Sequence, residues 1–185
     1  KLNNAKGLFK VTDGIYQVRG YDLSNMTLAE GKTGWIVIDP LLTAEIAKAT
    51  LAFALDKLGS KKPVVAVIYT HSHADHFGGV RGVINEADVL AGKVKVIAPE
   101  GFMDNAIAEN VLAVNAMTRR ATYQFGNGLD ANPRQGVGSG LGKALSAGTM
   151  GLIPPTDTVT KTGQEMTVDG VRIRFQMAQG SEAPS

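Results

Sequence analysis

The residues whose types and spacing could do chemistry lie in one short segment of this sequence. All three histidines of the 185-residue chain fall within six positions, at His71, His73 and His76, and Asp75 precedes the last of them. Histidines placed only for packing would rarely cluster in this way. Imidazole nitrogens and carboxylate oxygens without a thiolate are ligands for zinc, iron or manganese, and zinc is the commonest of these in hydrolysis. A surface histidine cluster that binds metal adventitiously is the alternative interpretation.

The element that must position these ligands comes directly before them. The continuous apolar, mostly β-branched run at 64–69 predicts a strand buried on both faces. On a loop leaving such a strand, His71 and His73 are two residues apart and can turn to the same side. Asp75 and His76 are then placed to meet a second ion nearby. The sequence therefore predicts one loop that supplies ligands to two metal ions.

Strands and helices alternate from Trp35 onward, which is typical of α/β proteins. Apolar residues at spacings of three and four predict a helix that begins after Thr43 as the N-cap and stops at Gly59. An Asp169-Gly170 pair between two β-like runs predicts a hairpin with a type I′ turn. The other expected elements are strands at 15–19, 25–30, 33–38 and 93–98 and a helix at 102–114. The glycine-rich stretch at 126–150 is left without an assigned element.

Composition places the chain among ordinary globular proteins. Hydrophobic residues make up 44%, charged residues 19%, and the formal net charge is +2, which excludes wholesale disorder. No apolar run approaches the roughly 18 residues of a membrane span, and no block of basic residues indicates a nucleic-acid partner. The absence of cysteine excludes disulfides and cysteine nucleophiles. The glycine-rich segment 136–144 fails as a phosphate-binding loop, because Val137 and Ala144 replace residues that such a loop requires. We expect one domain, covering 1–185.

The segment 70–79, Thr-His-Ser-His-Ala-Asp-His-Phe-Gly-Gly, contains the His-x-His-x-Asp-His motif of the metallo-β-lactamase superfamily. More narrowly, this segment together with 119–123 and 180–184 resembles the alkylsulfatase family that hydrolyses dodecyl sulfate, and the resemblance covers nearly the whole chain. It implies an α/β fold of the metallo-β-lactamase type, an αββα sandwich, present here only in part. It also implies zinc-dependent hydrolysis of alkyl sulfate esters to alcohol and sulfate by a metal-activated water.

The resemblance assigns ligands for two Zn²⁺ ions in the complete enzyme. His71, His73 and Glu182 would hold one ion, and Asp75 and His76 would belong to the other, with Asp75 also in the catalytic set. Glu182 is the discriminating residue, because most members of the superfamily place a histidine in that loop. A solvated turn residue is the alternative interpretation of Glu182.

Four further residues are candidates for supporting roles. Asp39 matches the superfamily's aspartate that braces the metal loop, although an aspartate that forms a turn before a proline is the alternative. Arg119 and Arg120 could meet a sulfate group, since guanidinium suits tetrahedral oxyanions, but neighbours on a helix point different ways. We therefore expect at most one of them to face the site, the alternative being a solvated helix face. Tyr123 could line the pocket or pack elsewhere.

Other expectations also follow from the resemblance. The family's pattern requires a bridging acidic residue and a further histidine downstream, so the 185 residues alone are expected to be inactive. A dimerisation region and a sterol-carrier-like domain are expected to follow, making the complete protein an exported homodimer that acts on a small-molecule alkyl sulfate. Because the motif specifies metals and water rather than the bond cleaved, hydrolysis of a thioester, lactone or β-lactam is the rival activity. A non-catalytic fragment is the third possibility.

Overall fold

The computed structural model describes residues 5–126, 128–130, 132, 145–178, 180, 181 and 183. Its main element is a seven-stranded sheet whose strands follow one another in chain order, β1 to β7. The first four strands pair antiparallel, and the last four pair parallel. The strands are β1 (Gly7–Thr12), β2 (Ile15–Arg19), β3 (Met26–Glu30), β4 (Trp35–Ile38), β5 (Val64–Ile68), β6 (Lys95–Pro99) and β7 (Asp157–Val159).

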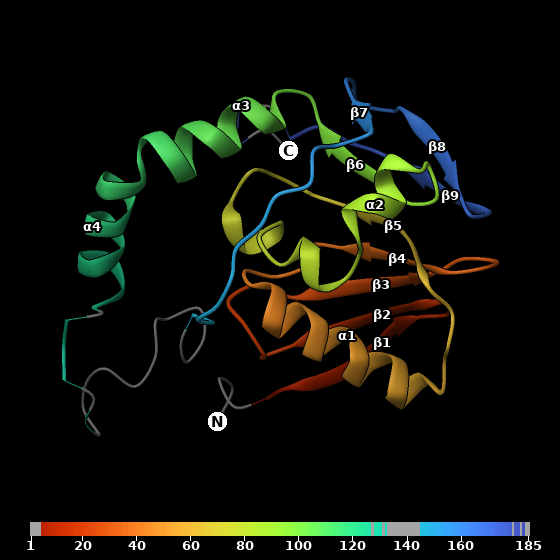
Figure 1. Cartoon of the computed structure of the whole chain (residues 1–185), viewed down its shortest axis with the longest axis horizontal. Helices are drawn as coiled ribbons and strands as arrows, with labels where there is room; N and C mark the ends of the chain where they lie inside the picture. Colours follow the sequence, from red (N-terminus) through yellow and green to blue (C-terminus); the bar gives the residue numbers. More distant parts are fainter. Residues whose placement is uncertain are drawn as a thin grey trace.

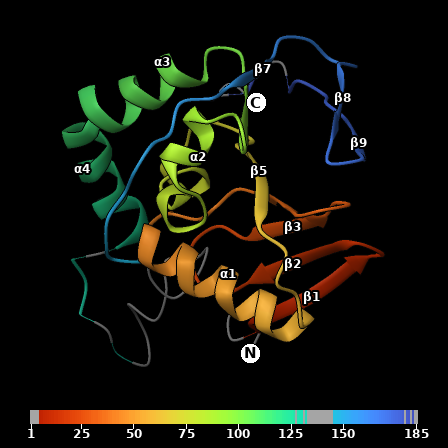
Figure 2. The same ribbon diagram turned by 45° about the vertical axis from the view of Figure 1, so that its right-hand side comes forward.

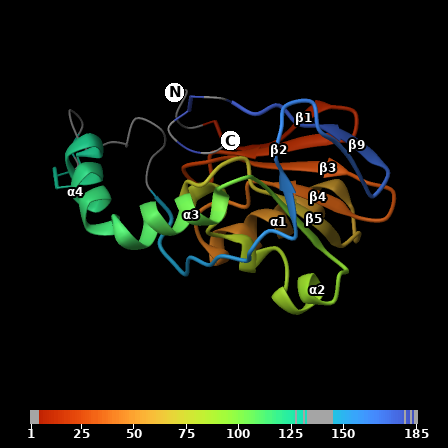
Figure 3. The same ribbon diagram turned by 90° about the horizontal axis from the view of Figure 1, so that it is seen from above.

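Helices connect the parallel strands and cover one face of the sheet (Figure 1). The larger apolar core lies there, where Val37, Val67 and Val96 from the strands pack with Leu51 of α1 and Phe102 of α3. From α3 the chain continues into α4, which extends away from the sheet (Figures 1 and 3). The helical elements are α1 (Ala44–Leu58), η2 (Ala74–His76), η3 (Val80–Gly82), α2 (Glu86–Leu90), α3 (Phe102–Ile107), η4 (Ala108–Leu112) and α4 (Val114–Phe125).

A hairpin of β8 (Glu165–Val168) and β9 (Val171–Arg174) packs on the other face of the sheet (Figure 2). A second apolar cluster lies between them, with Ile36, Ile68 and Ile97 from the sheet and Val168 from the hairpin. The order of layers is therefore helices, sheet, hairpin. This is the αββα arrangement expected from the sequence, present in part within the described residues.

Several predicted elements are confirmed. In β5, Ala66, Val67 and Ile68 are all buried, as expected for a strand covered on both faces. The β8–β9 turn has positive φ at both Asp169 (46°) and Gly170 (81°), as a type I′ turn requires. Helix α1 ends at Gly59, which adopts the left-handed conformation with φ 61°.

Other expectations need correction. Thr43 precedes α1 as predicted, but its side chain makes no cap bond. Its hydroxyl contacts the Ser146 hydroxyl at 3.2 Å instead. The Ala44 amide, at the first position of the helix, donates to the Thr149 carbonyl. The predicted helix 102–114 is broken by η4 and resumes as α4. Strands β1 and β7 and helix α2 were not predicted; the first two lie at the edges of the sheet. Within the described part of the chain, no helix is both long and apolar enough to span a bilayer.

Candidate metal centre

The histidine loop leaves β5 beside Asp39, which follows β4. Because β4 and β5 are parallel neighbours, their carboxyl ends meet at one edge of the sheet, the edge where α/β proteins bind ligands. Asp39 is buried and has a positive φ of 57°. Its Oδ1 accepts the Thr70 amide at 2.9 Å, and its Oδ2 accepts the Thr70 hydroxyl at 2.8 Å and His76 Nδ1 at 2.8 Å. Asp39 therefore joins the start and the end of the loop, as expected for a residue that supports it.

These contacts decide which ring nitrogens are available to a metal. A carboxylate only accepts hydrogen bonds, so His76 Nδ1 donates to Asp39 and the Thr70 hydroxyl donates its single proton to Asp39 as well. The Thr70 oxygen must then accept from His71 Nδ1, which lies 2.9 Å away. With their Nδ1 atoms protonated, the Nε2 atoms of His71 and His76 are the nitrogens that a metal ion would bind. Such outer partners are the usual means of orienting a ligating histidine.

Two pairs of donor atoms lie close together on this loop. His71 Nε2 and His73 Nδ1 are 3.1 Å apart, and His76 Nε2 and Asp75 Oδ2 are 3.3 Å apart. The His71 ring also lies close to that of His76, with centroids 4.0 Å apart, so the predicted division of the loop into two ligand pairs stays a prediction. Among the described residues, no three histidine, aspartate or glutamate side chains converge closely enough to enclose an ion. Glu182, the predicted third ligand of the first pair, lies outside the described residues.

The electrostatic environment differs between the two pairs. Burial, reinforced by the charges of His76 and His73, lowers the pKa of His71, which keeps that imidazole neutral. Burial opposes charging His76, but its hydrogen bonds to Asp39 and Asp75 outweigh burial and raise its pKa to about 9. Burial alone would raise the pKa of Asp75, yet the hydrogen bond and charge of His76 hold it below its ordinary value. His76 is thus held protonated beside the carboxylates of Asp39 and Asp75. Imidazole nitrogens and a carboxylate gathered on one loop are donor groups that fit a metal ion such as zinc.

A cavity of about 690 Å³ lies between this loop and α4. His73, Asp75 and His76 line it on one side, and Arg120 of α4 lies on another. Much of the remaining wall is apolar. The apolar side chains that line it are Leu23, Leu42, Ala74, Val114, Met117, Ala121, Phe125, Leu145 and Met150.

The two neighbouring arginines of α4 differ in position. Arg120 lines the cavity, whereas Arg119 does not, in line with the expectation that at most one would face the site. Tyr123 is not part of the cavity wall either, and 89% of its surface is exposed. Of the three predicted substrate contacts, the structure thus brings only Arg120 to the candidate site.

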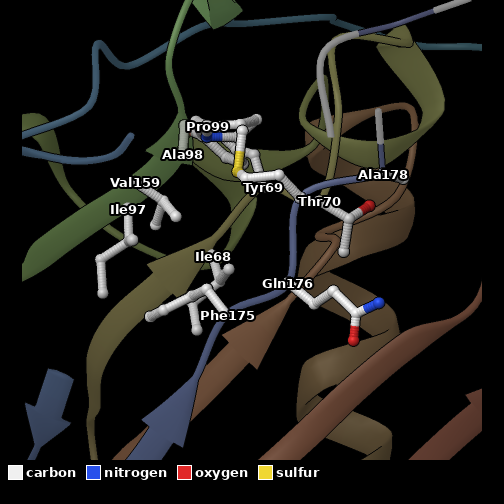
Figure 4. Close-up of a pocket in the computed structure, with 11 residues that line it drawn as sticks. Ile68, Tyr69, Thr70, Ile97, Ala98, Pro99, Val159, Phe175, Gln176 and Ala178 are labelled. Atoms are coloured by element: carbon white, nitrogen blue, oxygen red, sulfur yellow. The ribbon is translucent and has the colours of Figure 1, made fainter. Parts of the chain in front are cut away.

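A smaller cavity of about 210 Å³ lies at the carboxyl ends of β5, β6 and β7 (Figure 4). Its wall is mostly apolar and includes Ile68, Pro99 and Phe175, with Thr70 as one of its few polar members. Thr70 is also the residue that links Asp39 to His71. This cavity therefore adjoins Thr70 at the start of the histidine loop, whereas His73, Asp75 and His76 line the larger cavity.

Sequence reasoning missed several polar residues at the main cavity or next to its wall. Glu109 Oε1 approaches His73 Nε2 to 3.5 Å, and the Asn110 amide donates to the Ser72 carbonyl at 3.4 Å. The Ser24 hydroxyl donates to the Asp75 carbonyl. Asp22 accepts the Leu42 amide and the amide and hydroxyl of Ser146. No local pattern marks these residues, because each acts on a segment distant in the sequence.

Comparison with known proteins agrees with this fold. Residues 19–173 match the family model of the metallo-beta-lactamase superfamily. The match covers more than half of the chain, which therefore belongs to this superfamily.

Within the superfamily, the similarity to alkylsulfatases is confirmed. The chain is 58% identical, over all 185 residues, to a linear primary-alkylsulfatase of a Pseudomonas species and spans 27% of that protein. It is 53% identical over its whole length to the alkyl/aryl-sulfatase BDS1 of Saccharomyces cerevisiae, spanning 28% of it. The solved structure of the stereoselective inverting sec-alkylsulfatase Pisa1 from a Pseudomonas species superposes with a TM-score of 0.91 at 50% identity, covering 99% of this chain and 29% of that one. The chain thus spans somewhat more than a quarter of the length of these relatives.

Proposed function

We propose that this chain forms the metal-binding part of an alkylsulfatase, which hydrolyses alkyl sulfate esters to alcohol and sulfate with two zinc ions. The observation that carries the proposal is the composition of the cavity. Among the described residues that line it, His73, Asp75 and His76 lie on one side, Arg120 lies on another, and much of the remaining wall is apolar. The alkylsulfatase names of relatives more than 50% identical to the chain support the same substrate class.

Each part of the cavity has a role in this reaction. His71 Nε2 and His73 Nδ1 would hold one ion with Glu182, and Asp75 and His76 would contribute to the second site. When bound, the two ions would lower the pKa of a water molecule toward neutrality, so that hydroxide is available near pH 7. The Asp75 carboxylate also lines the cavity, where it can orient the attacking water.

The substrate would be recognised at both ends. The Arg120 guanidinium presents a planar set of N–H donors that suits the oxygens of a sulfate group. The alkyl chain would lie against the apolar wall, where burial contributes about 0.8 kcal/mol per methylene group. A charged head group next to a flexible apolar chain matches the combination of Arg120 and an extended apolar surface. A neutral lactam or thioester would make no use of Arg120.

The experiment is a substrate panel on the full-length protein. Purified enzyme is incubated with dodecyl sulfate, a β-lactam, a lactone and a thioester, and release of sulfate or opening of the other substrates is followed. We expect sulfate release that a chelator abolishes and Zn²⁺ restores, with two ions per chain by elemental analysis. Turnover of the β-lactam, the lactone or the thioester in preference to dodecyl sulfate, or sulfate release that survives metal removal, would overturn the proposal.

A further inference from the structure

A short π-helical turn interrupts the path from α3 to α4 next to the metal loop. In η4 the Ala113 amide donates to the Ala108 carbonyl, five residues back, at 2.9 Å. Such single turns are rare and are frequently found at functional sites. Glu109 and Asn110 lie within this turn, and both line the main cavity. The turn therefore brings two polar residues of a solvent-exposed helix to the histidine loop.

Contacts on both sides of His73 link this turn to the loop. Asn110 Nδ2 donates to the Ser72 carbonyl at 3.4 Å and to the Ala106 carbonyl at 2.9 Å, which joins the backbone of the loop to the helix. Glu109 Oε1 lies 3.5 Å from His73 Nε2, and the two side chains are only 22% and 31% exposed. A small rotation of the Glu109 side chain would bring these two atoms to ordinary hydrogen-bonding distance.

The contact of Glu109 with His73 resembles the contacts that His71 and His76 make with their outer partners. In each of these two histidines Nδ1 lies against an outer partner, Thr70 for His71 and Asp39 for His76, which leaves Nε2 for a metal ion. His73 has its Nδ1 toward His71 and its Nε2 toward Glu109. Glu109 thus lies beside Nε2 of His73 as Asp39 lies beside Nδ1 of His76, at 3.5 Å rather than 2.8 Å.

We propose that Glu109 is a positioning residue for His73, whose Nε2 proton it accepts so that the Nδ1 lone pair faces the metal. This inference rests on the proposed metal-dependent function. A carboxylate in this position fixes both the ring orientation and the tautomer, and it makes the other ring nitrogen a stronger ligand. The π-helical turn is the means by which a residue of the α3–α4 segment reaches the far side of the ring.

The test is the affinity of the full-length protein for Zn²⁺, measured by competition with a chromophoric chelator. Glu109→Ala removes the acceptor and should weaken one of the two ions about 10–100-fold. Glu109→Gln keeps an acceptor oxygen without the charge, so its affinity should fall between those of Glu109→Ala and the wild type. Asp104→Asn is the matched control, since Asp104 lies on α3 in an exposed position and this substitution also removes one negative charge. It should bind both ions as tightly as the wild type.

Two further readouts separate positioning from structure. Thermal unfolding of the metal-free proteins should give similar midpoints for Glu109→Gln and the wild type; a general destabilisation that accounts for the lost affinity would overturn the inference. A Glu109→Ala protein that binds zinc as tightly as the wild type would also overturn the inference about Glu109. In that case, dodecyl sulfate hydrolysis by the wild type would still leave the proposed function intact. A wild-type protein that binds no zinc would instead remove the proposed function itself.

Discussion

Asp39 Oδ2 accepts a hydrogen bond from His76 Nδ1 at 2.8 Å, although 37 residues separate the two positions. The parallel pairing of β4 with β5 brings them together, because each residue follows the carboxyl end of one of these strands. The same carboxylate holds the amide and hydroxyl of Thr70, at the beginning of the loop. One buried side chain therefore sets both the shape of the loop and the tautomer of one of its histidines.

The first prediction concerns this contact. Asp39→Asn should weaken zinc binding at the Asp75–His76 pair about 10–100-fold, the usual cost of losing an outer partner. Asparagine tolerates the positive φ of this position, and its Oδ1 can still accept the Thr70 amide. Its NH₂ group, however, would donate toward His76 Nδ1 and favour the tautomer whose Nε2 carries the proton and cannot bind metal. Chelator competition on the full-length protein measures the effect.

The control for Asp39→Asn is Asp56→Asn on the exposed side of α1, which removes the same charge far from the loop. Its affinity should match the wild type. If Asp39→Asn binds both ions normally, the tautomer of His76 is set by another group.

A second prediction compares two adjacent arginines. Arg120→Ala should lower kcat/KM for dodecyl sulfate about tenfold or more, because a hydrogen bond to a charged group contributes about 1.5–3 kcal/mol. Arg119→Ala removes the same side chain from the position that does not line the cavity and should leave the kinetics nearly unchanged. Steady-state kinetics of both variants are the measurement. Equal losses in the two variants would exclude a specific contact between Arg120 and the sulfate group.

The third prediction concerns Glu182, which lies outside the described residues. Glu182→Gln keeps the size of the side chain but removes the charge that a metal ligand supplies, so affinity for one ion should fall by about an order of magnitude or more. His71→Ala should weaken the same ion, whereas Asp75→Asn should weaken the other. Metal titration and sulfate release are measured together. Wild-type values of both for Glu182→Gln would show that this residue is not a ligand.

A fourth prediction concerns the stability of the fold as a function of pH. Asp169, in the β8–β9 turn, accepts the amides of Thr33 and Gly34 and the Thr33 hydroxyl, each at 2.8 Å. Its slight burial raises the pKa, but these hydrogen bonds outweigh that effect and hold the pKa of Asp169 below its ordinary value. The folded state therefore prefers the carboxylate. The resulting stability is present above the unfolded pKa of about 4 and is lost as the pH falls through the lower folded pKa.

Asp169→Asn should accordingly lower the melting temperature at pH 7 and flatten its decline in acid. Asparagine accepts the local positive φ, so the backbone of the turn is not strained by the substitution. Asp13→Asn is the control, because Asp13 also precedes a turn glycine but its side chain is 97% exposed. Melting curves between pH 3 and 7 that coincide for the two variants would contradict the prediction.

Features that depend on neighbouring residues could be read from the sequence. The β-branched run of β5 determines a strand buried on both faces. The histidines come directly after this run, so the loop that carries them begins at the end of the strand. Asp169-Gly170 determines the hairpin turn, because both residues tolerate positive φ. Gly59 stops α1 for the same reason. These local preferences agree with the final packing, so the tertiary structure leaves them unchanged.

What only the tertiary structure decided depends on contacts between distant segments and on the phase of a helix. The π-helical turn adds one residue to the path from α3 to α4, and this shift sets which side chains of α4 face the cavity. A regular α-helical repeat counted from Phe102 leaves out this extra residue. Neither the position of Arg120 nor the approach of Glu109 to His73 could therefore be predicted. Strand β7 is short and lies at the edge of the sheet, where pairing with β6 rather than its own pattern determines it. Local sequence places the three histidines and Asp75 on one loop, and long-range packing selects the residues that orient them.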